Sequence, residues 1–169
     1  VPFGEYVPFR SLLTFAEKLT REVGDFVPGS QRTVFSMDSF RMGAFICYES
    51  IFPDEIRQFA RNGAQVFVNV SNDGWFGETA APEQHLNQAR MRAIENRRWL
   101  LRATNTGITS SIDPYGRVVA RAPRNIRTAI DVPFDVVRST TFYTRYGDWF
   151  AWLCAIISLI ALLVRVSVR

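Results

Sequence analysis

The sequence has 169 residues, of which 47% are hydrophobic, 14% aromatic and 21% charged. This composition excludes a disordered, collagen-like or low-complexity chain, and the length suits one folded domain. The net charge of +4 comes from basic residues that are interspersed with acidic ones, so the pattern does not indicate nucleic-acid binding.

The first half of the chain predicts one helix followed by a strand-helix-strand unit. Leucine and phenylalanine recur at helical spacing over residues 11–21. β-Branched and aromatic runs predict strands over residues 33–37, 41–47 and 65–70. Pro53 and the two acidic residues after it begin a helix that ends near Arg61. The strands on either side of this helix should therefore be parallel and adjacent.

The second half predicts a long helix and then short strands. The helix covers residues 82–99, and a turn at Pro114, Tyr115 and Gly116 separates two of the strands that follow it. The strands are expected over residues 100–104, 108–113, 117–120 and 127–132. Residues 135–148 connect this part to an apolar C-terminal segment.

The C-terminal segment WFAWLCAIISLIALLV carries no charge and predicts a membrane-spanning helix. It is shorter than the ~20 residues that a bilayer requires, but a start near Tyr146 and snorkelling by Arg165 lengthen it. A buried core helix is the alternative, although such helices usually carry a polar stripe and this one has only Ser158.

The residues that flank this segment predict its orientation. Tyr143, Tyr146, Trp149 and Trp152 suit an aromatic belt in the headgroup region. The arginines that follow the segment predict a cytoplasmic C-terminus, with the globular part on the opposite side.

The first candidate functional residue is Cys47. Its spacing from Cys154, the other cysteine, predicts neither a disulfide framework nor a metal site. Cys47 ends the apolar strand GAFIC just before a helix N-terminus, which favours a nucleophilic thiolate. A packing role is the alternative, because free cysteines are often buried. Glu49 favours a site, since alternation along an extended chain puts it on the side of Cys47 and a buried carboxylate needs a partner.

A second candidate segment, Ser71 to Gly77, follows the strand over residues 65–70. Because the carboxyl ends of adjacent parallel strands meet, this segment and Cys47 should share a cleft. A structural turn is the alternative, but it leaves Trp75 and Phe76 unexplained. His85, the only histidine, suits a hydrogen-bonding role better than a general base. Glu95 and the arginines around it are expected to form a solvated helix face.

Five strings carry a resemblance to a known family: VPFGEYVPF, GAFICYESIFPDEIR, NVSNDGWFG, QHLNQARMRAIENRRWLLRATNTGITSSIDPYGRV and the closing apolar segment. Together they resemble bacterial apolipoprotein N-acyltransferases, membrane members of the carbon-nitrogen hydrolase (nitrilase) superfamily. The resemblance covers nearly the whole chain in collinear order. It implies the α/β class, as part of a nitrilase-like α-β-β-α sandwich followed by one transmembrane helix.

The resemblance also implies an activity and a site. The family's Glu-Lys-Cys triad takes the sn-1 acyl chain of a phospholipid as a cysteine thioester and passes it to the N-terminal diacylglyceryl-cysteine of an apolipoprotein. No cofactor or metal is implied. By position, Cys47 matches the nucleophile, Tyr48 and Glu49 lie beside it, and Glu5 matches the essential glutamate of the PFGE string. We expect the segment around Asn72, Trp75 and Phe76 to bind substrate.

The triad glutamate and lysine have no match here, and Lys18 does not fall on the lysine motif. The sequence begins with valine, so we expect a fragment that is inactive alone. The expected division is residues 1–134 for the C-terminal part of the catalytic domain, 135–146 for a linker, 147–166 for the membrane helix and 167–169 for a cytoplasmic tail. The expected location is the bacterial inner membrane, with the catalytic part in the periplasm. A membrane-anchored amidase or nitrilase and a non-catalytic interaction domain are the alternatives.

Overall fold

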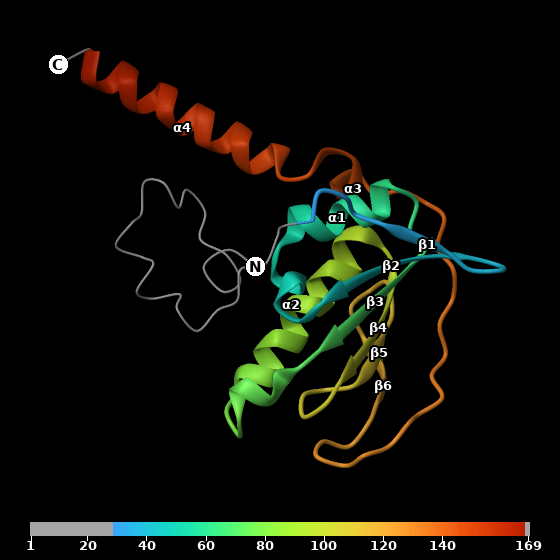
Figure 1. The fold of residues 1–169 in the computed structure, drawn as a ribbon. Helices are drawn as coiled ribbons and strands as arrows, with labels where there is room; N and C mark the ends of the chain where they lie inside the picture. Colours follow the sequence, from blue (N-terminus) through green and yellow to red (C-terminus); the bar gives the residue numbers. More distant parts are fainter. Residues whose placement is uncertain (1–28, 168–169) are drawn as a thin grey trace.

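The computed structural model describes residues 29–167 as one six-stranded sheet with helices on one face, followed by a long helix that extends away from it (Figure 1). The predicted helix over residues 11–21, and Glu5, lie outside the described residues. The strands are β1 (Val34–Ser36), β2 (Arg41–Ile46), β3 (Val66–Ser71), β4 (Trp99–Thr104), β5 (Ser110–Ile112) and β6 (Val118–Arg121). The helices are η2 (Cys47–Ile51), α1 (Pro53–Arg61), η3 (Asp73–Phe76), α2 (Ala81–Asn96), α3 (Phe142–Tyr146) and α4 (Trp149–Ser167).

The centre of the sheet is parallel and its edges are antiparallel. Strand β2 pairs with β3 and β3 with β4 in parallel, while β1 at one edge and β5 and β6 at the other run antiparallel to their neighbours. Helices α1 and α2 are the crossovers between the parallel strands. The predicted strand-helix-strand unit is therefore confirmed, and a second unit of the same kind follows it.

The hydrophobic core lies between the sheet and helices α1 and α2. Phe45 on β2 contacts Phe59 of α1 and Phe67 of β3, with ring centroids 6.3 and 5.8 Å away. Helix α1 approaches β2 closely, because a Cβ on Gly43 would lie 2.8 Å from the Cβ of Phe59. Any side chain larger than hydrogen at Gly43 would push the helix away from the sheet.

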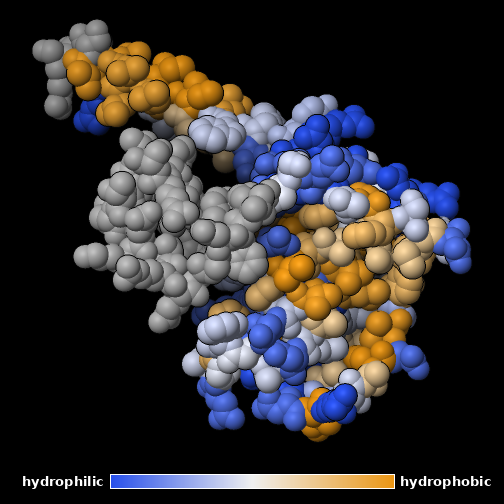
Figure 2. Space-filling view, in the orientation of Figure 1, coloured by the Kyte–Doolittle hydropathy of each residue, from blue (hydrophilic) through white to orange (hydrophobic). Residues whose placement is uncertain are grey.

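The opposite face of the sheet has no helix layer among the described residues. Ile46 and Val70 are register partners on this face, and 67% and 53% of their surface is exposed. Figure 2 shows apolar surface over the strands. The described part therefore forms one helix layer and one sheet of the expected α-β-β-α sandwich.

Two expectations about local structure are wrong. Residues 127–132 form no strand, because their alternating pattern finds no hydrogen-bonded neighbour and most of the segment is exposed. The arginines near Glu95 do not all lie on a solvated face, since Arg92 and Arg98 are 7% and 2% exposed. Arg98 donates to the carbonyl oxygens of Ala64 and Ser139, so it ties the end of α2 to a distant segment of the chain.

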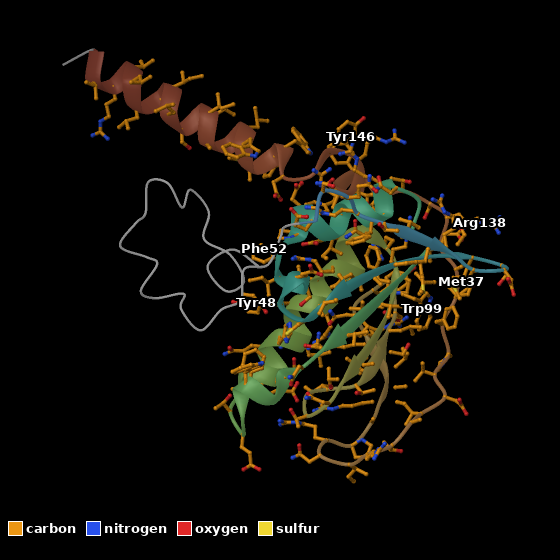
Figure 3. The ribbon with its side chains drawn as sticks, in the orientation of Figure 1. Met37, Tyr48, Phe52, Trp99, Arg138 and Tyr146 are labelled. Carbon is orange, nitrogen blue, oxygen red and sulfur yellow. The ribbon has the colours of Figure 1, made fainter. Side chains whose placement is uncertain are left out.

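The segment before α4 is anchored to the domain through α3. Thr144 is fully buried, and its hydroxyl donates to Asn96 Oδ1 at 2.8 Å. The Thr141 hydroxyl donates to the carbonyl oxygen of Glu95 at 2.6 Å. Burial and the nearby carboxylates of Glu95 and Asp148 raise the pKa of Tyr143 to about 12. Tyr143 is half-buried, whereas Tyr146 at the end of α3 is exposed (Figure 3).

Helix α4 carries the apolar C-terminal segment. The window Trp149–Val166 has a mean hydropathy of 2.3, and none of it is buried against the rest of the protein. It is the one helix of the described residues that is long and apolar enough to cross a membrane. Figure 2 shows it as a continuous apolar rod, which argues against the alternative of a buried core helix.

Candidate active site

Cys47 lies where β2 ends and the chain turns into η2. Its backbone has φ +49°, a left-handed conformation that few residues other than glycine adopt. The turn ends the strand sharply and leaves the sulfur at the carboxyl edge of the sheet, partly exposed. Strained backbone of this kind clusters at functional sites, because the surrounding structure must hold it in place.

Three side chains hold this turn from different elements. The Glu49 carboxylate accepts a hydrogen bond from the Ile46 backbone N–H at 2.6 Å. The Cys47 carbonyl oxygen lies 3.1 Å from Nε2 of His85 on α2 and 3.5 Å from Nδ2 of Asn69 on β3. The turn at Cys47 is therefore supported both from within η2 and from the elements packed against it.

The two candidate segments meet, as predicted. The Cys47 thiol lies 3.8 Å from the carbonyl oxygen of Asn72, which follows β3. The Asn72 side chain accepts a hydrogen bond from the Gly74 N–H at 3.1 Å and so caps η3. Its Oδ1 also accepts from Asn105 Nδ2 at 2.5 Å, so the loop after β4 joins the same edge.

A buried polar network lies beneath Cys47, between the sheet and α2. Asn69 is the register partner of Phe45, and Arg102 is the register partner of Asn69, so all three side chains point toward the helices. Arg102 donates to Asn69 Oδ1 and to Asp73 Oδ2, the latter at 3.0 Å, and both ends of this ion pair are fully buried. Asp73 Oδ1 lies 3.0 Å from His85 Nδ1. Burial lowers the pKa of Arg102 from its usual value, and the negative charges of Asp73 and of a Cys47 thiolate only partly oppose this effect.

The environment of Asp73 strongly favours its charged form. Burial opposes the charge, but hydrogen bonds from His85 and Ser71 and the positive charge of Arg102 outweigh it and lower the pKa of Asp73 from 3.8 to about 2. Gly107 is needed here, because a Cβ on it would lie 2.6 Å from the Asp73 carboxyl carbon.

This lowered pKa predicts acid sensitivity. A depressed carboxyl pKa stabilises the fold above pH 3.8, and this stability is lost as the pH falls from about 4 towards 2. The expected loss for Asp73 is on the order of 2 kcal/mol. The measurement is thermal unfolding of the intact protein and of its Asp73→Asn variant, each at pH 5 and at pH 3. The Tm of the unsubstituted protein should fall more between pH 5 and pH 3 than the Tm of the variant does, because the variant has no carboxyl group to protonate at this position. An equal decrease in the two proteins would contradict the assignment.

The structure places the other predicted residues as follows. Tyr48 is exposed on η2 next to Phe52, with ring centroids 6.4 Å apart (Figure 3). Trp75 is 86% exposed at the tip of the turn after β3, while the Phe76 ring packs edge-on against His85 at 5.7 Å. The argument that placed Glu49 beside Cys47 by strand alternation is wrong, because η2 begins at Cys47, and Glu49 is exposed rather than buried.

Sequence reasoning missed the network itself. The sequence pattern places Asp73 in the candidate segment Ser71 to Gly77 without a role of its own, and Arg102 among basic residues that are interspersed with acidic ones. The signal that could have found them is polar side chains within otherwise apolar strands: Asn69 in VFVNV and Arg102 in WLLRAT. A charge at a helix-facing strand position requires a buried partner.

No group of three or more metal-ligating side chains occurs within residues 29–167. The structure thus combines an α/β sheet, a strained turn at its carboxyl edge and a thiol on that turn. These features define an α/β protein with a candidate cysteine nucleophile.

Comparison with known proteins identifies the family. The carbon-nitrogen hydrolase family model matches residues 8–142. Apolipoprotein N-acyltransferase of Geobacter metallireducens is 44% identical over 154 residues, which are 91% of this chain and 30% of that protein. Its counterpart in Methylococcus capsulatus is 45% identical over 158 residues, covering 92% of this chain and 31% of that protein.

A solved structure shares the fold. Nit3 of Saccharomyces cerevisiae, a member of branch 10 of the nitrilase superfamily, superposes with a TM-score of 0.51 at 25% identity, covering 59% of this chain and 40% of that one. The chain belongs to the carbon-nitrogen hydrolase family. It spans about a third of the length of the curated relatives that it matches.

Proposed function

We propose that the intact protein carrying this sequence is an N-acyltransferase that moves a phospholipid acyl chain to the N-terminal diacylglyceryl-cysteine of apolipoproteins. The observation that carries this proposal is a thiol on a strained turn in a domain tied to an exposed apolar helix. A bilayer anchor suits a lipid acyl donor better than a small soluble amide. The similarity to apolipoprotein N-acyltransferases supports the choice of acceptor.

The proposed reaction has two steps. The Cys47 thiolate attacks the carbonyl carbon of the sn-1 ester, the ester C–O bond breaks, and the lysophospholipid leaves after its oxygen gains a proton. The α-amino nitrogen of the acceptor then attacks the thioester, the C–S bond breaks, and an amide forms while the amine loses a proton. Among the described side chains, no basic group lies at hydrogen-bond distance from the Cys47 sulfur, whose recorded partner is the Asn72 carbonyl.

The test is an incubation of the intact protein in detergent with labelled phospholipid and a diacylglyceryl-cysteine peptide. Label on the peptide is the expected result. Label released only as free fatty acid would instead identify a hydrolase. Absence of any labelled protein, with Cys47 inert to thiol reagents, would identify a non-catalytic domain.

Trp75 is proposed to contact the acyl chain, because a large apolar ring that is 86% exposed has no packing role in the described structure. Trp75→Ala should raise KM for the phospholipid by about tenfold or more, since the ring would lose its apolar contact with the chain. Tyr115→Ala is the matched control, because Tyr115 is 65% exposed in the turn between β5 and β6. Equal KM values for the two variants would exclude this role for Trp75.

Helix α4 is proposed to span the inner membrane with Arg169 in the cytoplasm and the sheet in the periplasm. A fluorescent protein fused after Arg169 should fluoresce, and alkaline phosphatase fused there should be inactive, since arginines favour the cytoplasmic side. Active phosphatase at this position would reverse the proposed orientation.

A further inference from the structure

His85 contacts the turn at Cys47, and the proposed reaction steps do not use this contact. The ring is 2% exposed, and its Nε2 lies 3.1 Å from the carbonyl oxygen of Cys47 and 3.0 Å from Ser50 Oγ. Within this turn Cys47 is the residue with the left-handed backbone, and the carbonyl that Nε2 contacts is its own. A donor at that oxygen therefore acts directly on the strained turn.

The chemistry of the contact fixes the role of Nε2. A carbonyl oxygen only accepts, so the contact with Cys47 is attractive when Nε2 carries a hydrogen. The other ring nitrogen, Nδ1, lies 2.9 Å from Arg102 Nη2 and 3.0 Å from Asp73 Oδ1. In the neutral ring Nδ1 accepts from Arg102, and in the charged ring it donates to Asp73. Nε2 donates to Cys47 in both states.

Both ring nitrogens are thus occupied, which excludes His85 as the acceptor of the thiol proton in this arrangement. The buried pair of Asp73 and Arg102 holds the ring from one side, with 3.0 Å between the charged atoms. Phe76 packs edge-on against the same ring. A ring held in this way delivers its N–H to a fixed point, which is what a positioning group requires.

We propose that His85 is a positioning residue that holds Cys47 in its left-handed turn by donating its Nε2 hydrogen to the Cys47 carbonyl. The inference deepens the proposed function and rests on it for the kinetic effect. Without this hydrogen bond the turn relaxes toward extended backbone. Alternation along β2 would then direct the sulfur to the side of Phe45, into the buried network and away from an acyl donor.

Two substitutions in the intact protein separate this role from simple packing. His85→Gln places an amide N–H near the position of Nε2 and keeps the bond to Cys47. His85→Asn has an amide of the same kind, but it reaches only the position of Nδ1. We expect His85→Asn to lower kcat by about 100-fold, because small displacements of reacting groups cost this much. His85→Gln should stay within about tenfold of the unsubstituted protein.

Two further readouts test the same point. KM for the phospholipid should change less than about twofold in both variants, since a buried ring does not contact substrate. Alkylation of Cys47 by iodoacetamide, followed by mass spectrometry of its peptide, should slow by about fivefold or more in His85→Asn alone, because its sulfur becomes buried. Ser50→Ala removes the other contact of His85 Nε2, so it is the control for changes around this ring and should stay within about threefold in kcat.

Several results would overturn the inference: a folded His85→Asn protein with unchanged kcat and alkylation, equal losses in the Asn and Gln variants, or a raised KM with unchanged kcat. If His85→Asn does not fold, the decision rests on the folded His85→Gln protein. A kcat lowered about 100-fold in His85→Gln overturns the inference, and a near-normal kcat in His85→Gln supports it. If the unsubstituted protein forms no acyl thioester, the proposed function fails, while the alkylation rates still decide the positioning role.

Discussion

Cys47→Ser should abolish both thioester formation and acyl transfer in the intact protein. The substitution keeps the size of the side chain and the turn that carries it, so the fold should be preserved. The expected decrease in rate is at least about 1000-fold, because serine supplies almost no alkoxide at neutral pH while a thiol ionises readily. The measurement is retention of label from acyl-labelled phospholipid on the protein, with hydroxylamine release as the signature of a thioester.

Cys154→Ser is the matched control for this prediction. Cys154 lies on α4, where no part of the helix is buried against the domain. The same chemical change there should leave labelling and transfer unchanged. Hydroxylamine-sensitive label at the unsubstituted level in Cys47→Ser would show that another residue is the nucleophile.

The central part of the fold could be predicted because local and long-range signals agree there. Pro53 and two acidic residues mark the start of α1, and apolar strands flank it, so only a parallel pairing of β2 with β3 fits. The strand expected over residues 127–132 shows the limit of this reasoning. Its pattern suits a strand, but pairing depends on a neighbour that the local sequence does not specify.

The site could be predicted in outline for a related reason. Both candidate segments follow adjacent parallel strands, so the rule that carboxyl ends meet at one edge brought Cys47 and Asn72 together. The left-handed turn at Cys47 could not be foreseen, because the strand pattern continues up to it. The network of Asp73, His85 and Arg102 comes from three separate elements, and its pairing is set by tertiary packing alone.

Asp73→Asn should be strongly destabilising, because it leaves the Arg102 charge buried without its partner. Both side chains are fully buried, and Asp73 also accepts a hydrogen bond from Ser71 Oγ at 2.5 Å. Removing one member of a buried ion pair typically costs about 3 to 5 kcal/mol of unfolding free energy. Thermal unfolding of the intact protein in detergent measures the effect as a lowered Tm. Adding Arg102→Met should recover part of the loss, since the unpaired charge is removed.

Asp54→Asn provides the same chemical change at an exposed ion pair. Asp54 on α1 accepts a hydrogen bond from Arg57 Nε at 3.0 Å, and its side chain is 59% exposed. An exposed pair contributes about 1 kcal/mol or less, so the Tm of this variant should hardly change. If Asp73→Asn lowers the Tm no more than Asp54→Asn does, the buried pair does not stabilise the fold beneath Cys47. The ring of His85 would then depend on packing rather than on charge for its orientation.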